Sequence, residues 1–255
     1  MKKLKEFATT AQYEAYTADT ANFILPNVSI CNDNPTVVYY NPYVDPYNGH
    51  DYVDLGLSVK WAKCNVGAEK EEEYGLYFQW GDTSGYTAEQ VTGSSTPHKD
   101  FSWADYKYSN NGGSTETDMT KYNSSDGKTV LEASDDAATA NMGSSWRMPT
   151  EAEFNELINT ANTTSAWTTV NRVYGVTFTS KKSGYTDKYV FFPAAGYCYN
   201  GILRNKGSYG YVWSSSLHSS DILYGMSLDF GNGYRNVDDF NIRRYGFSVR
   251  GVFGG

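Results

Sequence analysis

The chain has 255 residues, of which 40% are hydrophobic, 20% charged and 16% aromatic, and it contains 23 Tyr. This aromatic content excludes disorder over most of the chain, because disordered segments are poor in aromatic residues. The formal net charge of −8 argues against electrostatic binding to nucleic acid or to an anionic membrane, and no apolar run reaches the roughly 18 residues of a membrane span.

Residues 1–48 differ from the rest of the chain and are interpreted as an attachment or oligomerisation segment. Apolar residues recur at helical spacing between residues 4 and 18, which predicts a short amphipathic helix. Runs at 22–30 and 36–40 are typical of strands. One helix and two strands bury little apolar surface by themselves. The start of the chain lacks the uninterrupted apolar stretch of a signal peptide, so no secretion signal is expected.

Residues 49–255 predict a single loop-rich domain. Thr150 and Glu153 form a capping-box pattern at the start of one helix. A second helix is expected over about residues 130–141. The polar stretch 83–128 predicts long irregular structure held by short aromatic anchors.

The last 60 or so residues are typical of β-strands. Residues Met226–Phe230 alternate, so Ser227 and Asp229 are expected on an exposed face and their apolar neighbours on a buried one. Gly231-Asn232-Gly233 predicts a turn. Together these elements predict an α+β class, with a few helices around twisted antiparallel strands.

Searches for known catalytic and metal-binding patterns give no positive result. There is no phosphate-binding glycine loop, no dinucleotide fingerprint and no HExxH. The three histidines, His50, His98 and His218, lack metal-ligand spacing. The pair Asp135-Asp136 is interpreted as solvated charge. The sequence therefore predicts no catalytic residue, no metal and no cofactor.

Several short motifs, taken together, resemble a known family. They are Asp54-Leu55-Gly56-Leu57-Ser58-Val59-Lys60-Trp61-Ala62, Trp80-Gly81-Asp82, Ser145-Trp146-Arg147-Met148-Pro149-Thr150, Trp213-Ser214-Ser215-Ser216 and Gly246-Phe247-Ser248-Val249-Arg250. Their order resembles the Fibrobacter major paralogous domain, on the formylglycine-generating-enzyme-like branch. The resemblance covers about residues 51–253 and implies the C-type lectin fold.

The activities known within that fold do not carry over. Formylglycine-generating enzymes use a cysteine pair in the C-terminal half, where this chain has only Cys198. Calcium-dependent sugar lectins carry Glu-Pro-Asn or Gln-Pro-Asp with Trp-Asn-Asp, and none of these triplets occurs. The motifs therefore predict scaffold: their large Trp rings fill the core, and function lies elsewhere.

The tail has an unusual composition, because residues 207–255 contain no Lys, Glu or Gln. The positions that look exposed carry residues that are reachable from an asparagine codon by changing its adenines, whereas Lys, Glu, Gln, Trp and Met are not reachable. This resembles the variable region of diversity-generating retroelement target proteins, here about residues 210–250. The resemblance implies that the following residues form one diversified ligand-binding surface: His218, Asp221, Tyr224, Tyr234, Arg235, Asn236, Asp238, Phe240, Asn241, Ile242, Arg244, Tyr245 and Phe247.

The first functional hypothesis is a non-enzymatic receptor-binding protein, such as a tail-fibre tip of a gut Bacteroides phage. A bacterial surface adhesin is the second, and a hydrolytic or carbohydrate-active enzyme with an unrecognised site is the third. The expected partner is a protein or glycan receptor on a cell surface, with no nucleic acid and no membrane insertion. The expected location is a virion or the cell exterior, and a fibre tip would be a homotrimer.

Overall fold

The computed structural model describes residues 2–6, 28–30, 37–40, 47–93, 95–237 and 240–254. The chain forms two compact units, residues 1–49 and 50–255. In the first unit, β1 (Lys2–Glu6), β2 (Val28–Ile30) and β3 (Val37–Tyr40) form an antiparallel sheet in the order β1-β3-β2. The prediction of a helix over residues 4–18 is wrong for residues 4–6, which belong to β1. Residues 7–18 lie outside the described ranges.

The helices of the second unit are short. The capping box of α4 is confirmed, with Thr150 accepting from the backbone N–H of Glu153 and the Glu153 side chain accepting in return. The helix expected over 130–141 is shorter, because Asp136 starts it late and Gly143 follows its end. The elements are α2 (Ala88–Thr92), η2 (Asn110–Gly112), η3 (Glu116–Asp118), η4 (Ala133–Asp135), α3 (Ala137–Met142) and α4 (Glu151–Ile158).

The strands of the second unit form small sheets whose neighbouring strands all run antiparallel. The sheet orders are β4-β5-β16-β6, β7-β8-β9, β10-β11 and β12-β13-β14, with β15 also pairing with β13. The strands are β4 (Tyr52–Val53), β5 (Lys60–Asn65), β6 (Trp146–Arg147), β7 (Thr163–Val170), β8 (Val173–Ser180), β9 (Tyr189–Pro193), β10 (Tyr197–Tyr199), β11 (Ile202–Arg204), β12 (Tyr209–Leu217), β13 (Tyr224–Gly231), β14 (Tyr234–Asn236), β15 (Phe240–Ile242) and β16 (Arg250–Phe253).

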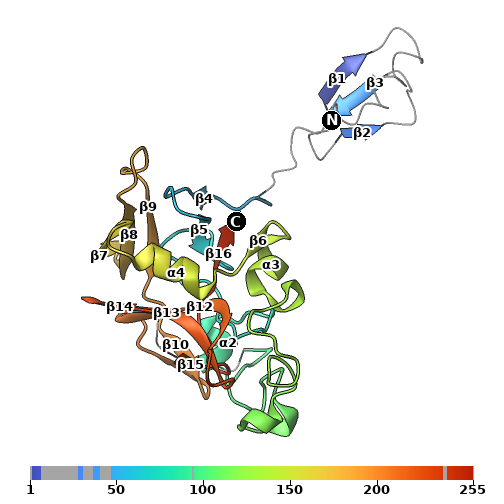
Figure 1. Cartoon of the computed structure of the whole chain (residues 1–255), viewed down its shortest axis with the longest axis vertical. Helices are drawn as coiled ribbons and strands as arrows, with labels where there is room; N and C mark the ends of the chain where they lie inside the picture. The colour runs from blue at the N-terminus through green and yellow to red at the C-terminus, as the bar shows by residue number, and fades with distance from the viewer. Residues whose placement is uncertain are drawn as a thin grey trace. The chain divides into compact units, whose positions relative to one another are not determined.

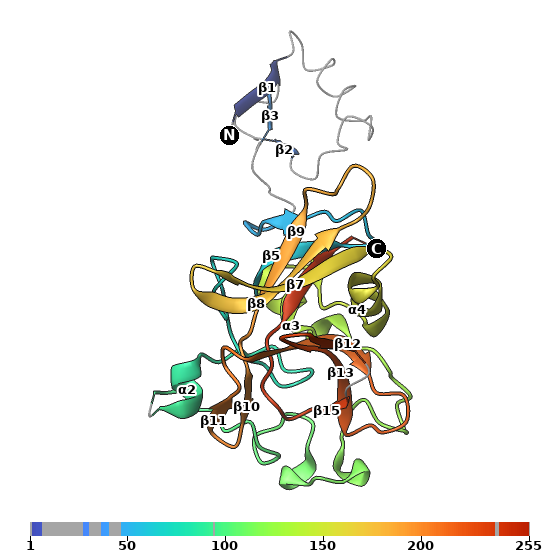
Figure 2. The same ribbon diagram turned by 90° about the vertical axis from the view of Figure 1, so that its left-hand side faces the viewer.

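The main core lies where these sheets meet around α4. Helix α4 contacts β7, β12 and β13 and lies between the two sheets to which those strands belong (Figure 1). Phe154 and Leu157 are the buried residues of the helix, and they pack with Trp61, Phe192 and Phe230. Figure 2 shows the β7-β8-β9 sheet on one side of this core and the β12-β13 sheet on the other. The C-terminal strand β16 lies between β5 and β6.

The sequence prediction of an α+β class is wrong, because the structure is mostly β. Strands take up 36% of the chain and helices 14%, and the strands form several small antiparallel sheets with no closed barrel in the described part. The physical reason is helix length. The helical patterns are real, but α3 has six residues and α4 has eight. Such short helices cover part of a sheet without forming a layer of their own.

The predicted scaffold residues are confirmed as core. Trp61, Trp80, Trp146 and Trp213 are all buried. The scaffold expected within the tail is buried as well, from Met226, Leu228 and Phe230 to Ser248, Val249 and Arg250. None of the described helices is long and apolar enough to cross a bilayer.

Candidate binding surface

Strand β13 lies between β12 and β14, and its two faces have different roles. The register pairs Val212 with Leu228, and both belong to the core cluster. On the opposite face, Tyr211 and Asn236 flank Asp229 from the two neighbouring strands. We call this opposite face of β13, with its partners on β12, β14 and β15, the tail face.

Three residues that the sequence predicted as binding residues lie on the tail face. Tyr234 lies opposite Gly231, Asn236 opposite Asp229 and Asn241 opposite Gly225. Because Gly225, Asp229 and Gly231 are separated by even numbers of residues, their cross-strand partners point to the same side. The β14 and β15 segments therefore contribute to one surface through alternate residues.

The tail face is not open along its whole length, and this corrects the expectation for Ser227 and Asp229. Both side chains are buried, with Asp229 only 4% exposed. On β12, Trp213 lies opposite Ser227, and the Phe247 ring stacks on Trp213 with centroids 4.1 Å apart. The alternation predicted the two faces, but β13 is an interior strand and Phe247 covers part of its second face.

The buried polar groups of the tail face bind one another. Asn241 Nδ2 donates to Ser227 Oγ at 2.8 Å and to Asp229 Oδ2 at 2.9 Å. Ser227 Oγ donates to Asp229 Oδ1 at 2.7 Å. Asn241 therefore positions the floor of the surface, and only part of its side chain faces solvent.

Above this floor lies a group of partly exposed tyrosines that we call the tyrosine cluster: Tyr197, Tyr199, Tyr211 and Tyr245. The Tyr197 ring lies 5.1 Å from that of Tyr211 and 5.6 Å from that of Tyr245, centroid to centroid. The Tyr199 and Tyr245 rings are 5.2 Å apart. Burial raises the pKa of Tyr211 and of Tyr245, and the neighbouring Arg244 charge partly offsets the shift of Tyr245. These hydroxyls therefore stay protonated at neutral pH.

Sequence reasoning selected only Tyr245 of this cluster. Tyr197 and Tyr199 lie before the tail, on β10, with the buried Cys198 between them. The alternation of Tyr, Cys and Tyr is typical of a strand with one buried and one exposed face, and this pattern could have predicted both tyrosines as surface residues. It was missed because the search followed the composition of the tail, whereas the surface is assembled across sheets.

Arg244 lies at the edge of the tyrosine cluster. Its guanidinium carbon is 4.6 Å from the Tyr199 ring centroid and 5.2 Å from that of Tyr245. Its Nη1 donates to the carbonyls of Phe101 (3.3 Å) and of the Asn200 side chain (3.2 Å). The residue is half-buried, so it can still reach a ligand.

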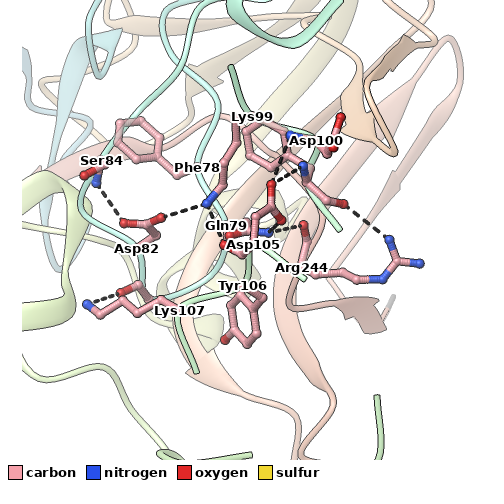
Figure 3. A network of polar contacts seen from close by, with 12 residues as sticks. Phe78, Gln79, Asp82, Ser84, Lys99, Asp100, Asp105, Tyr106, Lys107 and Arg244 are labelled. Atoms are coloured by element: carbon pink, nitrogen blue, oxygen red, sulfur yellow. Dashed lines mark hydrogen bonds and ion pairs between the residues drawn. The ribbon is translucent and has the colours of Figure 1, made fainter. Parts of the chain in front are cut away.

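A polar network supports the backbone of Arg244 (Figure 3). The Asp105 carboxylate accepts from the backbone N–H groups of Asp100, Phe101 and Ser102 at 2.7–3.0 Å. Gln79 Nε2 donates to this carboxylate at 3.1 Å and to the Arg244 carbonyl at 3.0 Å. The network thus fixes the loop on which Arg244 rests.

Arg243, the neighbour of Arg244, is completely buried. Its Nε donates to the Tyr106 hydroxyl at 2.8 Å, and its terminal nitrogens donate to the backbone carbonyls of Lys121, Tyr122 and Ile222 at 2.7–3.0 Å. The guanidinium carbon lies 5.0 Å from the Trp80 ring. This residue was not singled out in the sequence, and it joins the tail to the long irregular segment.

The same segment is held by Asp135, which corrects the interpretation of Asp135-Asp136 as solvated charge. Both carboxylates are buried. Lys107, Lys121 and Tyr122 all donate to Asp135. Burial raises the pKa of Asp135, but these hydrogen bonds outweigh it and lower the net pKa well below its ordinary value. Asp136 caps α3 instead, and burial raises its pKa.

The other predicted binding residues fall into separate places. His218, Asp221, Tyr224 and Ile242 lie together at the β12–β13 turn, where the His218 Nδ1 accepts from the backbone of Asp221 at 3.1 Å and Tyr224 pairs with Ile242. They are half-buried. Tyr224 is an even number of residues from Met226 and Leu228, so the Tyr224–Ile242 pair lies on their side of the sheet and not on the tail face.

Two further predicted residues do not belong to the tail face. Arg235 lies opposite Phe230, on the core side of the sheet, and its buried Nε has no hydrogen-bond partner among the described residues. Phe247 is fully buried and is a core residue. Asp238 and the side chain of Phe240 lie outside the described residues. Only part of the predicted set of binding residues therefore forms one shared surface.

The described residues hold no group of three or more His, Cys, Asp or Glu side chains placed to bind a metal ion. Cys198 is buried, and burial raises the pKa of its thiol. A thiol in that state is a poor nucleophile.

A family model described as a domain of unknown function (DUF8237) matches residues 179–252. The matched segment runs from the end of β8 into β16 and contains the tail face and the tyrosine cluster. No curated protein and no solved structure gave a match.

The two neighbouring arginines make a matched pair for a stability test. Arg243→Lys should lower the free energy of unfolding by at least about 2 kcal/mol, because the ammonium cannot replace the hydrogen bonds of a buried guanidinium. Arg244→Lys should cost less than about 1 kcal/mol, because that side chain is partly solvated. Urea denaturation of both variants measures the difference. Equal losses would contradict the structural role assigned to Arg243.

The lowered pKa of Asp135 predicts that the free energy of unfolding depends on pH. Its folded-state pKa is lowered, so its contribution to stability is present above the unfolded value of about 4 and disappears as the pH falls further. The stability deficit of Asp135→Asn should therefore be full at neutral pH and shrink below about pH 4.

Asp136→Asn is the internal control for this measurement. The raised folded-state pKa of Asp136 has the opposite sign, so the deficit of that variant should grow as the pH falls. Denaturation midpoints of both variants and of the parent chain, taken across this pH range, give the comparison. A deficit of Asp135→Asn that does not change with pH would contradict the assigned ion-pair network.

Proposed function

We propose that this chain is a non-enzymatic receptor-binding protein that displays a diversified surface built on its C-terminal sheet. The surface consists of the tail face and the tyrosine cluster. In this respect the chain resembles the variable proteins of diversity-generating retroelements, in which adenine-directed mutagenesis changes chosen codons.

One observation carries the proposal. Residues 207–255 contain no Lys, Glu or Gln, and within this stretch buried and solvent-facing side chains alternate closely. Arg243 is buried and Arg244 is not, and the buried Phe247 follows the half-exposed Tyr245 by two residues. Buried scaffold residues and exposed residues thus alternate within a few positions. The exposed residues can change without disturbing the core.

The chemistry of the surface suits recognition of varied partners. Tyrosine gives a large contact area at a low cost in conformational entropy, and asparagine and serine adapt their hydrogen bonds, as in antibody loops. Tyr and Arg are also the residues in which binding energy concentrates. Tyr245 and Arg244 supply both types side by side, and Tyr234 adds a further tyrosine on the tail face.

The proposed place of action is a phage virion, as a tail-fibre or other receptor-binding component, with residues 1–48 as its attachment segment. A bacterial adhesin is the alternative, since it would use the same surface. An enzyme with an unrecognised site is the alternative of another class. Tail genes beside this gene would favour the virion, and turnover of a substrate would favour the enzyme.

The test of diversification is the neighbourhood of the gene. We expect a reverse-transcriptase gene nearby, with a template repeat that matches codons 210–250 and differs from them at adenines of the template. The differing codons should include those for Tyr234, Asn236, Arg244 and Tyr245 and exclude those for Arg243 and Phe247. A repeat that varies the buried codons equally, or no such repeat, would refute the proposal.

The test of binding uses fluorescently labelled protein and a panel of gut Bacteroides strains, with cell binding measured by flow cytometry. The triple variant Tyr234→Ala, Asn236→Ala and Tyr245→Ala should lose binding to any strain that the parent labels. Its melting temperature should change little, because substitutions at partly exposed positions usually have small effects. The matched control is Tyr189→Ala, a comparably exposed tyrosine on β9.

A further inference from the structure

A groove outside the tyrosine cluster gathers aromatic side chains from separate parts of the chain. It has a volume of about 420 Å³. The β7–β8 hairpin contributes Trp167 and Tyr174, the start of β12 contributes Tyr209, and the β13–β14 turn contributes Asn232. Gly207 and Ser208 complete the lining.

The rings form an open platform. The Trp167 and Tyr174 rings lie nearly parallel, with an interplanar angle of 9° and centroids 6.1 Å apart. Tyr174 is 51% exposed and Tyr209 is 43% exposed. Cross-strand stacking within the hairpin accounts for the first two rings. It does not account for Tyr209, which belongs to another sheet and faces the same groove.

The polar part of the groove is neutral. None of its lining side chains is charged. Within the described ranges, the Ser208 hydroxyl and the Asn232 amide make no hydrogen bond to another group of the protein. Donors and acceptors thus remain available beside the rings, as in sites where a few polar groups orient a ligand on an apolar wall.

We propose that this groove is a fixed binding site for a neutral saccharide. A pyranose ring has one face of polarised C–H groups, which suits the negative face of an aromatic ring. Its edge carries hydroxyls that Ser208 and Asn232 can bind. Because no carboxylate lines the groove, binding requires no calcium. The proposal goes beyond the proposed function, since Trp167 and Tyr174 lie on another sheet and before the tail, and the groove meets the tail only at Tyr209, opposite Gly231, and at the β13–β14 turn.

The test uses the full chain on an array of neutral and acidic glycans, with and without EDTA, followed by titration of the glycans that bind. Neutral glycans should bind, and EDTA should have no effect. Tyr174→Ala and Tyr209→Ala should each weaken binding by about tenfold or more, whereas the control Tyr189→Ala should leave it unchanged. Circular dichroism and melting temperature of each variant exclude a loss of folding as the cause.

Several outcomes would overturn the proposal. They are the absence of binding to any neutral glycan at millimolar concentration, a preference for acidic glycans, loss of binding in EDTA, and no effect of Tyr174→Ala. A proline-rich peptide library is tested in parallel, because aromatic grooves also bind such peptides, and binding of peptides in place of glycans would assign the groove to them. The triple variant Tyr234→Ala, Asn236→Ala and Tyr245→Ala should keep glycan binding, which separates this result from the proposed function.

Discussion

The structure of the C-terminal half depends on the buried cation of Arg243. Arg243 has no access to solvent, and its guanidinium is satisfied by three backbone carbonyls and the Tyr106 hydroxyl. A buried charge without such partners would be very costly, so the chain must bring residues 106–122 to the tail in order to fold. The Asp135 cluster holds the same segment from its other side. Arg243 therefore connects the long irregular stretch between α2 and η4 to the segment that carries the candidate surface.

This arrangement explains how a loop-rich region can present side chains in fixed positions. Arg244 and Tyr245 follow directly after the buried anchor, and the Arg244 carbonyl is held by Gln79. Gly246 then passes so close to Phe101 and Cys198 that a Cβ atom would overlap them. Fixed side chains lose less entropy when a partner binds, which favours affinity without a deep pocket.

The sequence predicted the local features well and the assembled ones poorly. The capping box of Thr150 and Glu153, the Gly231–Gly233 turn and the buried Trp rings follow from short-range patterns, and the structure contains them. The burial of Asp229 was not predictable from its alternation, because the residue that covers its face, Phe247, comes from a different part of the chain. The fold class failed for a related reason, since a helical pattern does not reveal how much of a sheet a short helix will cover. Tyr197 and Tyr199 were missed because they join the surface from another sheet.

The position of β16 has a consequence for protein quality control. This strand follows the proposed variable stretch and lies between β5 and β6 in the sheet, where Arg250 pairs with Asn65 and Val252 with Trp61. A chain that stops early or shifts its reading frame within the tail lacks this middle strand and leaves the buried ring of Trp61 without its partner. Such a chain cannot complete its core and is open to proteolysis. Under the proposed diversification, mutations that change the frame are thereby removed by misfolding, whereas substitutions at exposed positions are tolerated.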